Sequence, residues 1–304
     1  MAHKIYDNFY LSNEVEDQFN SHLDLTRFCN VDNSLVGTAG MLRKINVYRA
    51  TNGTEKLAMG HGNSKTIEVS FVPKEYRIEL AQNRFAYFDE EEMTDPMLVP
   101  TGVRHMGTDM FNTENGDVFG EFQKATMVLP ITNLNFDSFV DAQAMFNLEN
   151  IEGVNFFAFV CATDMAEIRK ALKETLQYVK EYATSGYVGT VGGVNLYTKR
   201  DAKPGEVIVA TKDAVTLFNK KGTEIETERE SNIRKNTIYS RKYYLVALTD
   251  ETKAVKISKT AKFTATQDTT VQEKVYYTKN GNGYMAVIPS TENPKTEGLF
   301  ELSK

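Results

Sequence analysis

Apolar and polar residues alternate in three short runs between residues 41 and 93. Alternation with a period of two places the apolar side chains on one face of a strand. Turn-forming residues separate the first two runs, and Pro73 is the one breaker in the outgoing arm, which favours a bend or an edge position there. A two-stranded ribbon of this length is marginal alone and exposes its edges, so we expect other copies of the chain to cover it. The runs are Ile45–Val47, Ile67–Phe71 and Tyr76–Leu80.

A rough helical stripe of apolar residues follows over residues 94–127. A capping residue at 94 or 95, followed by Pro96, predicts where this helix begins. Pro100 lacks a backbone donor one turn in, and Asn115-Gly116 is a poor pair for a helix interior. The sequence therefore predicts a bent or interrupted helix.

Residues 136–220 have the texture of an α/β region. The continuous apolar run 156–161 is typical of a strand that is buried on both faces. Asp164 with Glu167 three residues on has the pattern of a capping box, which predicts a helix that continues to a stop at Gly186. The other expected elements are a helix over 137–148, a buried strand over 207–210 and a short strand over 215–218.

Residues 223–257 return to extended structure, with a long strand predicted over 237–249. Four glutamates alternate along one strand face and are interleaved with and followed by basic residues. Like charges in a row repel, so they need basic partners from the same segment folded back or from a neighbouring subunit. Ion pairing between subunits and a plain solvated face remain equal alternatives. The charged residues are Glu224, Glu226, Glu228, Glu230, Arg229, Arg234, Lys235, Arg241 and Lys242.

The last segment, residues 258–304, is rich in Thr, Lys and Asn. Apolar residues at 275–277 and 284–288 flank the turn Asn280–Gly283, which is a hairpin signal. We expect a small β module or a strapping tail.

Composition excludes several classes of protein. The chain has 304 residues, of which 41% are hydrophobic and 25% charged, as in ordinary soluble globular proteins. No run is long enough to span a membrane, and residues 1–10 lack the apolar core of a signal peptide, so export is not expected. The net charge of −6 argues against a surface that reads nucleic acid, but not against a container for it. Cys29 and Cys161 are predicted to be buried thiols rather than a disulfide.

No catalytic or metal-binding constellation is predicted. The histidines at 3, 22, 61 and 105 show no ligand spacing, and no Ser or Cys nucleophile has a partnered His. The acidic run 89–92 is better explained by a helix start than by a divalent-ion patch. The glycines at 186, 189, 192 and 193 resemble a phosphate cradle only superficially, because they follow a helix, lead into an apolar run and lack the Lys-Ser/Thr ending. A glycine hairpin or corner is the better interpretation, and no cofactor is expected.

The order of these elements resembles the major capsid proteins of tailed double-stranded DNA phages, which have the Hong Kong 97 type of shell fold. The resemblance covers about residues 20–257, and it is the order of elements rather than any single motif that carries it. Residues 31–40 and 234–239 also resemble short sequence segments of shell proteins from phages of Gram-positive hosts. The elements are the ribbon 41–88, the acidic turn into a helix 89–96, the helix and glycines 172–193 with Val194–Tyr197, and the return strand 237–249.

This resemblance implies an α+β capsid fold with an additional C-terminal part. Residues 1–40 would be the N-terminal arm and 41–93 an extended loop (E-loop) lying over an adjacent subunit. Residues 94–132 and 223–257 would form the peripheral domain with its long spine helix, and 133–222 the axial domain at fivefold and sixfold axes. Residues 258–304 would be a β extension beyond the common core.

The same resemblance implies a structural protein and not an enzyme. It would self-assemble into pentamers and hexamers of an icosahedral or prolate head, in the host bacterial cytoplasm, around double-stranded DNA held without sequence-specific contacts. A portal and a separate scaffold protein are expected partners, and no membrane is. One alternative is an encapsulin-like shell holding a cargo enzyme; another, of a different class, is a soluble phosphate-handling α/β enzyme built on residues 133–222.

We expect assembly contacts at the ribbon tip and on the charged return strands, and an axial-domain turn at the glycines. Some relatives cross-link subunits through Lys and Asn with an assisting Glu, but ordinary surface residues are the favoured interpretation of Lys56, Asn63 and Lys65. The expected assembly residues are Asn52, Gly53, Lys56, His61, Asn63, Lys65, Glu224, Glu226, Glu228, Arg234, Lys235 and Arg241, and the axial turn comprises Gly186, Gly189, Gly192 and Gly193.

Overall fold

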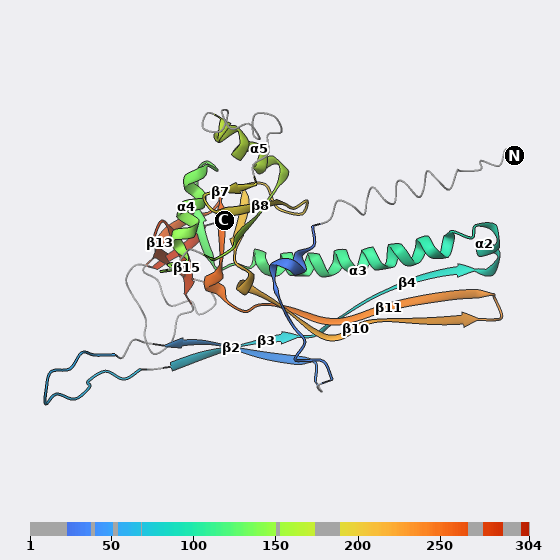
Figure 1. Ribbon diagram of the computed structural model, residues 1–304, viewed down its shortest axis with the longest axis horizontal. Coiled ribbons are helices and arrows are strands. Elements are labelled where there is room, and N and C mark those ends of the chain that lie inside the picture. The colour runs from blue at the N-terminus through green and yellow to red at the C-terminus, as the bar shows by residue number, and fades with distance from the viewer. Residues whose placement is uncertain are drawn as a thin grey trace. The chain divides into compact units, whose positions relative to one another are not determined.

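The chain divides into two compact units in a computed structural model (Figure 1). Unit 1 comprises residues 1–19, 31–113 and 217–249, and unit 2 comprises residues 20–30, 114–216 and 250–304. The structure describes residues 23–37, 40–50, 54–67, 69–149, 153–173, 189–266, 276–287 and 299–303, with the backbone alone at 45–50 and 69–73.

Unit 1 contains a two-stranded antiparallel ribbon, which confirms the prediction made from the alternation of apolar and polar residues. It pairs β2 (Leu42–Ala50) with β3 (Val69–Arg77) along their full length. Pro73 lies opposite Asn46 and is tolerated because each strand of a two-stranded sheet has one unpaired edge. The Lys44 ammonium lies 2.6 Å from the Glu75 carboxylate across the ribbon, and this carboxylate raises the pKa of Lys44.

A four-stranded sheet, in the order β1-β10-β11-β4, forms the body of unit 1. The hairpin of β10 and β11 is long, and β11 pairs antiparallel with β4 over ten residues. The expected short strand at 215–218 is wrong: these buried residues begin a 16-residue strand, which continues with mostly polar and mostly exposed positions from Asn219 on. The bounds are β1 Asn30–Asp32, β4 Glu79–Phe88, β10 Val215–Glu230 and β11 Lys235–Leu248.

Residues 94–127, expected to form one bent or interrupted helix, contain an unbroken helix α3 (Leu98–Gln123), and a shorter helix α2 (Asp89–Thr94) precedes it. Asp95 separates them, and its carboxylate accepts a hydrogen bond of 3.0 Å from the Met97 amide. Pro100 does not break α3 because it lies in the first turn, where backbone N–H groups have no partner within the helix. The prediction of an interruption at Pro100 is therefore wrong.

Helix α3 packs closely on strand β4 within unit 1. A Cβ at Gly102 would lie 2.6 Å from the Phe85 ring, so glycine permits this approach. The Asn83 amide donates to the Met106 carbonyl at 2.8 Å, which fixes the strand against the helix. The two elements run side by side in Figure 1.

Unit 2 is built on a ten-stranded sheet in the order β13-β16-β14-β15-β5-β12-β9-β6-β8-β7. Strands β6 and β8 are parallel, as are β5 and β12, and β6 is buried along its whole length. Helices α4 (Phe136–Met145) and α5 (Ala162–Ala171) contribute buried residues to its core. The strands are β5 Met127–Pro130, β6 Phe156–Val160, β7 Thr190–Val191, β8 Val194–Thr198, β9 Glu206–Ala210, β12 Ala254–Ser258, β13 Lys262–Thr266, β14 Tyr276–Asn280, β15 Gly283–Val287 and β16 Leu299–Ser303.

Strand β6 is buried on both faces, which confirms the prediction from its apolar run. Its even-numbered residues belong to the main core cluster with α4 and α5. On the other face Phe157 and Phe159 contact the rings of Phe119 and Phe122 from α3. Phe28 of the 3-10 helix η1 (Leu25–Phe28) adds to this aromatic cluster.

Asn115 is retained in α3 because it holds the segment before η1. Its side chain accepts a hydrogen bond of 3.0 Å from the Leu25 amide and donates one of 3.2 Å to the Leu23 carbonyl. The residue is 1% exposed, so these bonds satisfy an amide that would otherwise be costly to bury. A poor helix residue thus contributes through a contact that the local sequence does not reveal.

Helix α5 begins at Ala162, and the capping box expected at Asp164 and Glu167 is wrong. The buried Asp164 carboxylate accepts a hydrogen bond of 2.7 Å from the Gly205 amide. Glu167 is ion-paired with Lys259 and accepts from the Leu134 amide at 3.3 Å. Both carboxylates fasten α5 to neighbouring loops of unit 2, and residues 174–188 lie outside the described part.

The hairpin expected near the C-terminus is confirmed as β14 and β15, with Asn280 opposite Gly283. Strand β15 also pairs with β5, so the C-terminal strands are integral to the sheet of unit 2. A Cβ at Gly283 would lie 2.4 Å from the Met145 sulfur, which explains the glycine. Two further 3-10 turns, η2 (Lys212–Ala214) and η3 (Glu251–Lys253), complete the described elements.

Candidate assembly surfaces

The loop between the ribbon strands, residues 54–67, carries four of the expected assembly residues. Its two arms are joined where the Glu55 carboxylate accepts hydrogen bonds from the amide and the hydroxyl of Ser64, both at 2.8 Å. These donors hold the pKa of Glu55 below its usual value. The His61 amide closes a turn on the Ala58 carbonyl at 3.1 Å, and the Asn63 amide group donates to the Lys65 carbonyl at 2.7 Å.

This tip loop places apolar and basic side chains on its surface. Leu57 is 50% exposed, Met59 is fully exposed and Ile67 is 55% exposed. Lys56 and Lys65 are exposed as well, and neither has an ion-pair partner in the described part of the chain. Asn52 and Gly53, also expected to make assembly contacts, lie outside the described residues.

The glutamates of β10 find partners within their own hairpin and its neighbours. Glu226 pairs with Arg241 of β11, and the Tyr239 hydroxyl donates to Glu228 at 3.2 Å. Lys235 lies 3.9 Å from Glu230. Glu224 lies 2.6 Å from Lys221 on its own strand and raises the pKa of that lysine. Of the alternatives that the sequence left open, folding of the segment back on itself supplies these partners.

The hairpin tip is fastened to α2 by its basic residues. Arg229 lies 2.7 Å from Asp89, and Arg234 lies 2.7 Å from Glu90. The Arg234 carbonyl also accepts from the Asp89 amide at 3.1 Å. These contacts hold Arg234 in the left-handed region, at φ 53°, where a non-glycine residue is strained.

The acidic run at 89–92 is the first turn of α2 itself rather than a lead into the long helix. Glu91 accepts from the Phe88 amide at 3.0 Å, as a capping residue does. Negative charge in this turn is favoured by the helix dipole, so a structural explanation accounts for the run. No group of three or more potential metal ligands occurs within the described residues.

The axial turn is a glycine hairpin between β7 and β8. Gly192 and Gly193 have φ of 56° and 82°, which glycine adopts without strain. The Gln143 amide of α4 donates to the Gly192 carbonyl at 2.6 Å. Gly189 precedes β7, and its carbonyl accepts from the Leu196 amide at 2.9 Å. Gly186 lies outside the described residues. The described glycines lead into strand β8, whereas the glycines of a phosphate cradle lead into a helix.

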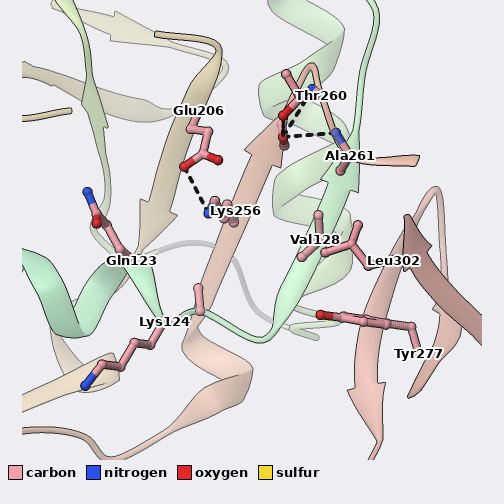
Figure 2. A pocket seen from close by; sticks show the side chains of 11 residues that line it. Gln123, Lys124, Val128, Glu206, Lys256, Thr260, Ala261, Tyr277 and Leu302 are labelled. Carbon is pink, nitrogen blue, oxygen red and sulfur yellow. Dashed lines mark hydrogen bonds and ion pairs between the residues drawn. The ribbon is translucent and has the colours of Figure 1, made fainter. Parts of the chain in front are cut away.

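A cleft of about 290 Å³ lies in unit 2 beside the C-terminal strands (Figure 2). Its Lys256 ammonium and Glu206 carboxylate are 2.9 Å apart and neutralise each other. Burial raises the pKa of Tyr277, which also lines the cleft, so its hydroxyl is protonated at neutral pH. These lining groups include no nucleophile paired with a base, so the cleft offers no recognisable catalytic arrangement.

No disulfide joins Cys29, which is buried, to Cys161, which is half-buried. In the described part of the chain, no helix is both long and apolar enough to cross a membrane.

The chain is similar to known capsid proteins in sequence and in fold. No family model matches the chain. A curated protein named as the major capsid protein of Staphylococcus phage phiMR11 is 26% identical over 255 residues, which cover 81% of this chain and 90% of that protein. A chain from the capsid asymmetric unit of cyanophage Pam1 superposes with a TM-score of 0.61 at 9% identity, covering 79% of this chain and 93% of that one.

A virus-like particle from Pyrococcus furiosus matches with a TM-score of 0.53 at 12% identity, covering 83% of this chain and all of that one. Structural likeness at such low identity establishes the fold, and a phage major capsid protein is similar in sequence as well. The chain therefore has the Hong Kong 97 type fold of phage major capsid proteins, which confirms the recognition made from the sequence.

Proposed function

We propose that this chain is the shell-forming subunit of a phage head, assembling in many copies as pentamers and hexamers around double-stranded DNA. The observation that carries the proposal is the match to a curated phage major capsid protein over 90% of that protein's length, on a shell fold. The protein is then a structural component of the virion rather than an enzyme.

Surface exposure in unit 1 supports self-assembly. Of the seventeen large hydrophobic side chains that are exposed among the described residues, fourteen belong to unit 1. Single exposed apolar residues are common, but an excess on one unit marks an interaction surface. Neighbouring copies of the chain would cover it, and many weak contacts would sum to a stable shell.

We assign domain roles by the order of elements. Residues 41–93 act as the extended loop, residues 94–132 and 223–257 as the peripheral domain with α3 as its spine helix, and residues 133–222 as the axial domain. The arm is residues 1–40. Residues 258–304 add strands to the sheet of unit 2, which suggests a bracing role within the subunit.

We assign assembly contacts to the expected residues of the tip loop and of the β10–β11 hairpin, and an inter-subunit role to the glycine turn before β8. Assembly would take place in the host cytoplasm with a portal and a separate scaffold protein. The internal ion pairs of the hairpin support a narrower role for it, because they stiffen a projecting element rather than leave its charges for a neighbour.

A cargo-holding shell is the second candidate, because a virus-like particle from Pyrococcus furiosus shares the fold and the fold does not decide what a shell encloses. Purified particles would separate the two by their contents. Nuclease-resistant double-stranded DNA in particles from infected cells supports a phage head. Particles that contain a foreign enzyme and no DNA contradict it.

The phosphate-handling enzyme has less support, because Gly192 and Gly193 form a strand hairpin and not a cradle at a helix start. Sedimentation of the purified chain tests it directly. Particles in the megadalton range are expected of a shell protein, whereas a monomer or small oligomer would favour the enzyme.

A further inference from the structure

The tip loop, residues 54–67, exposes both apolar and basic side chains. Its one described carboxylate, Glu55, is engaged by Ser64 within the loop. The two lysines are left to act outward, and they flank the exposed Leu57 and Met59. A surface of this kind fits a partner that combines apolar area with negative charge.

Such a surface exists around α2 of the same chain. Phe88, Met93 and Met97 are 41%, 82% and 54% exposed. They lie among five carboxylates between Asp89 and Asp95, two of which, Asp89 and Glu90, are paired with arginines. We call the surface of Phe88, Glu92, Met93 and Met97 the α2 patch. Glu92 is exposed and has no ion-pair partner in the described part of the chain.

One chain cannot bring its own tip loop to its own α2 patch. The backbone runs from Val69 to Phe88 as two strands separated by Ile78 alone, a path of roughly 60 Å at about 3.3 Å per residue. The Ile78 amide is bonded to the Met41 carbonyl at 2.8 Å, which continues the ribbon pairing across that residue. The tip loop and α2 lie at opposite ends of this path in Figure 1.

We propose that the tip loop of one subunit docks on the α2 patch of a second copy of this chain, with Leu57 and Met59 against Met93 and Met97, and with Lys56 or Lys65 paired with Glu92. This inference rests on the proposed shell function and names the surface that receives the loop. Buried methionines adapt to irregular contacts, and a charged rim selects the register of the pair.

Charge reversal with rescue tests the pairing. The variant Lys56→Glu/Lys65→Glu is expected to lower the yield of sedimenting particles by at least roughly tenfold, since many copies of the same repulsion add up. Adding Glu92→Lys in the same chain is expected to restore most of that yield. The matched control, Lys203→Glu/Lys212→Glu, makes the same charge change at exposed lysines of unit 2 and should leave the yield unchanged.

A zero-length carbodiimide locates the contact in wild-type particles built from mixed ¹⁵N-labelled and unlabelled subunits. We expect peptides that join Lys56 or Lys65 to Glu92 and carry both labels. Normal particles that lack these peptides, or that form undiminished from the double variant, would overturn the docking and leave the shell function standing. Absence of particles from the wild-type chain would overturn both.

Discussion

Unit 2 and the ribbon of unit 1 solve the problem of burial in different ways. Unit 2 encloses a core of twenty described residues between its sheet and helices α4 and α5. A core cluster in unit 1 has five, among them Leu35 and Ile78, while apolar side chains along the ribbon, its tip and α2 stay exposed. One part of the chain thus encloses its own core, and the other leaves apolar surface exposed, which we propose that further copies of the chain cover. The comparison predicts that damage to the first lowers stability and damage to the second lowers assembly.

The largest expected effect on stability comes from the centre of unit 2. Phe159 on β6 is fully buried and contacts four other phenylalanines, so Phe159→Ala should lower the free energy of unfolding by about 3–5 kcal/mol. Urea denaturation followed by circular dichroism measures it. Met59→Ala at the fully exposed tip is the control and should change that free energy by less than about 0.5 kcal/mol. Equal losses of unfolding free energy in the two variants would contradict the contrast between a buried core in unit 2 and an exposed tip in unit 1.

A smaller loss is expected where α3 holds the N-terminal segment. Asn115→Ala leaves the Leu25 amide without its acceptor, which costs about 1–3 kcal/mol, offset by roughly 0.5 kcal/mol from better helix propensity. The adjacent Gly116→Ala is the control, since a Cβ there meets nothing within 4 Å and should stabilise the helix by up to about 1 kcal/mol. Thermal unfolding of both variants checks the pair. A stabilised Asn115→Ala would show that the amide does not hold this segment.

The smallest effect concerns pH. The Lys259 ammonium, with the Leu134 amide, holds the pKa of Glu167 below its ordinary value. A lowered pKa in the folded state gives stability that is present above the ordinary carboxyl pKa and is lost as the pH falls through the folded value. Glu167→Gln should therefore be less stable than wild type at pH 7, by about 0.5 kcal/mol for a partly exposed pair, and this difference should shrink as the pH falls through the folded pKa of Glu167. A difference in stability that stays constant as the pH is lowered would point to packing instead of charge.

Much of this fold follows from local pattern, because strand alternation, buried apolar runs and turn residues act over a few positions. The ribbon, β6 and the C-terminal hairpin were predicted on that basis. The wrong predictions depend on contacts between residues that are distant in sequence. Asp164 and Glu167 suit a capping box, but their carboxylates instead bind the Gly205 amide and the Lys259 ammonium. Pro100 was misjudged because its cost depends on where the helix begins, and helix ends are the least certain part of a pattern.

The candidate surfaces show the same limit. Sequence reasoning located the charged strands and the ribbon tip, but it did not anticipate the exposed apolar residues at Phe88, Met93 and Met97. Their exposure depends on how α2 is held by Arg229 and Arg234, which lie about 140 residues away. The acidic run beside Met93 and Met97 was the available signal, but the sequence interpretation explained that run by a helix start alone.

Deletion of residues 52–63 tests the central claim most directly, when the variant is compared with the wild type by analytical ultracentrifugation and by its midpoint of thermal unfolding. The account predicts an unchanged midpoint together with loss of the megadalton particles that the wild-type chain forms. Particles of normal size from the deleted chain would contradict the role given to the ribbon.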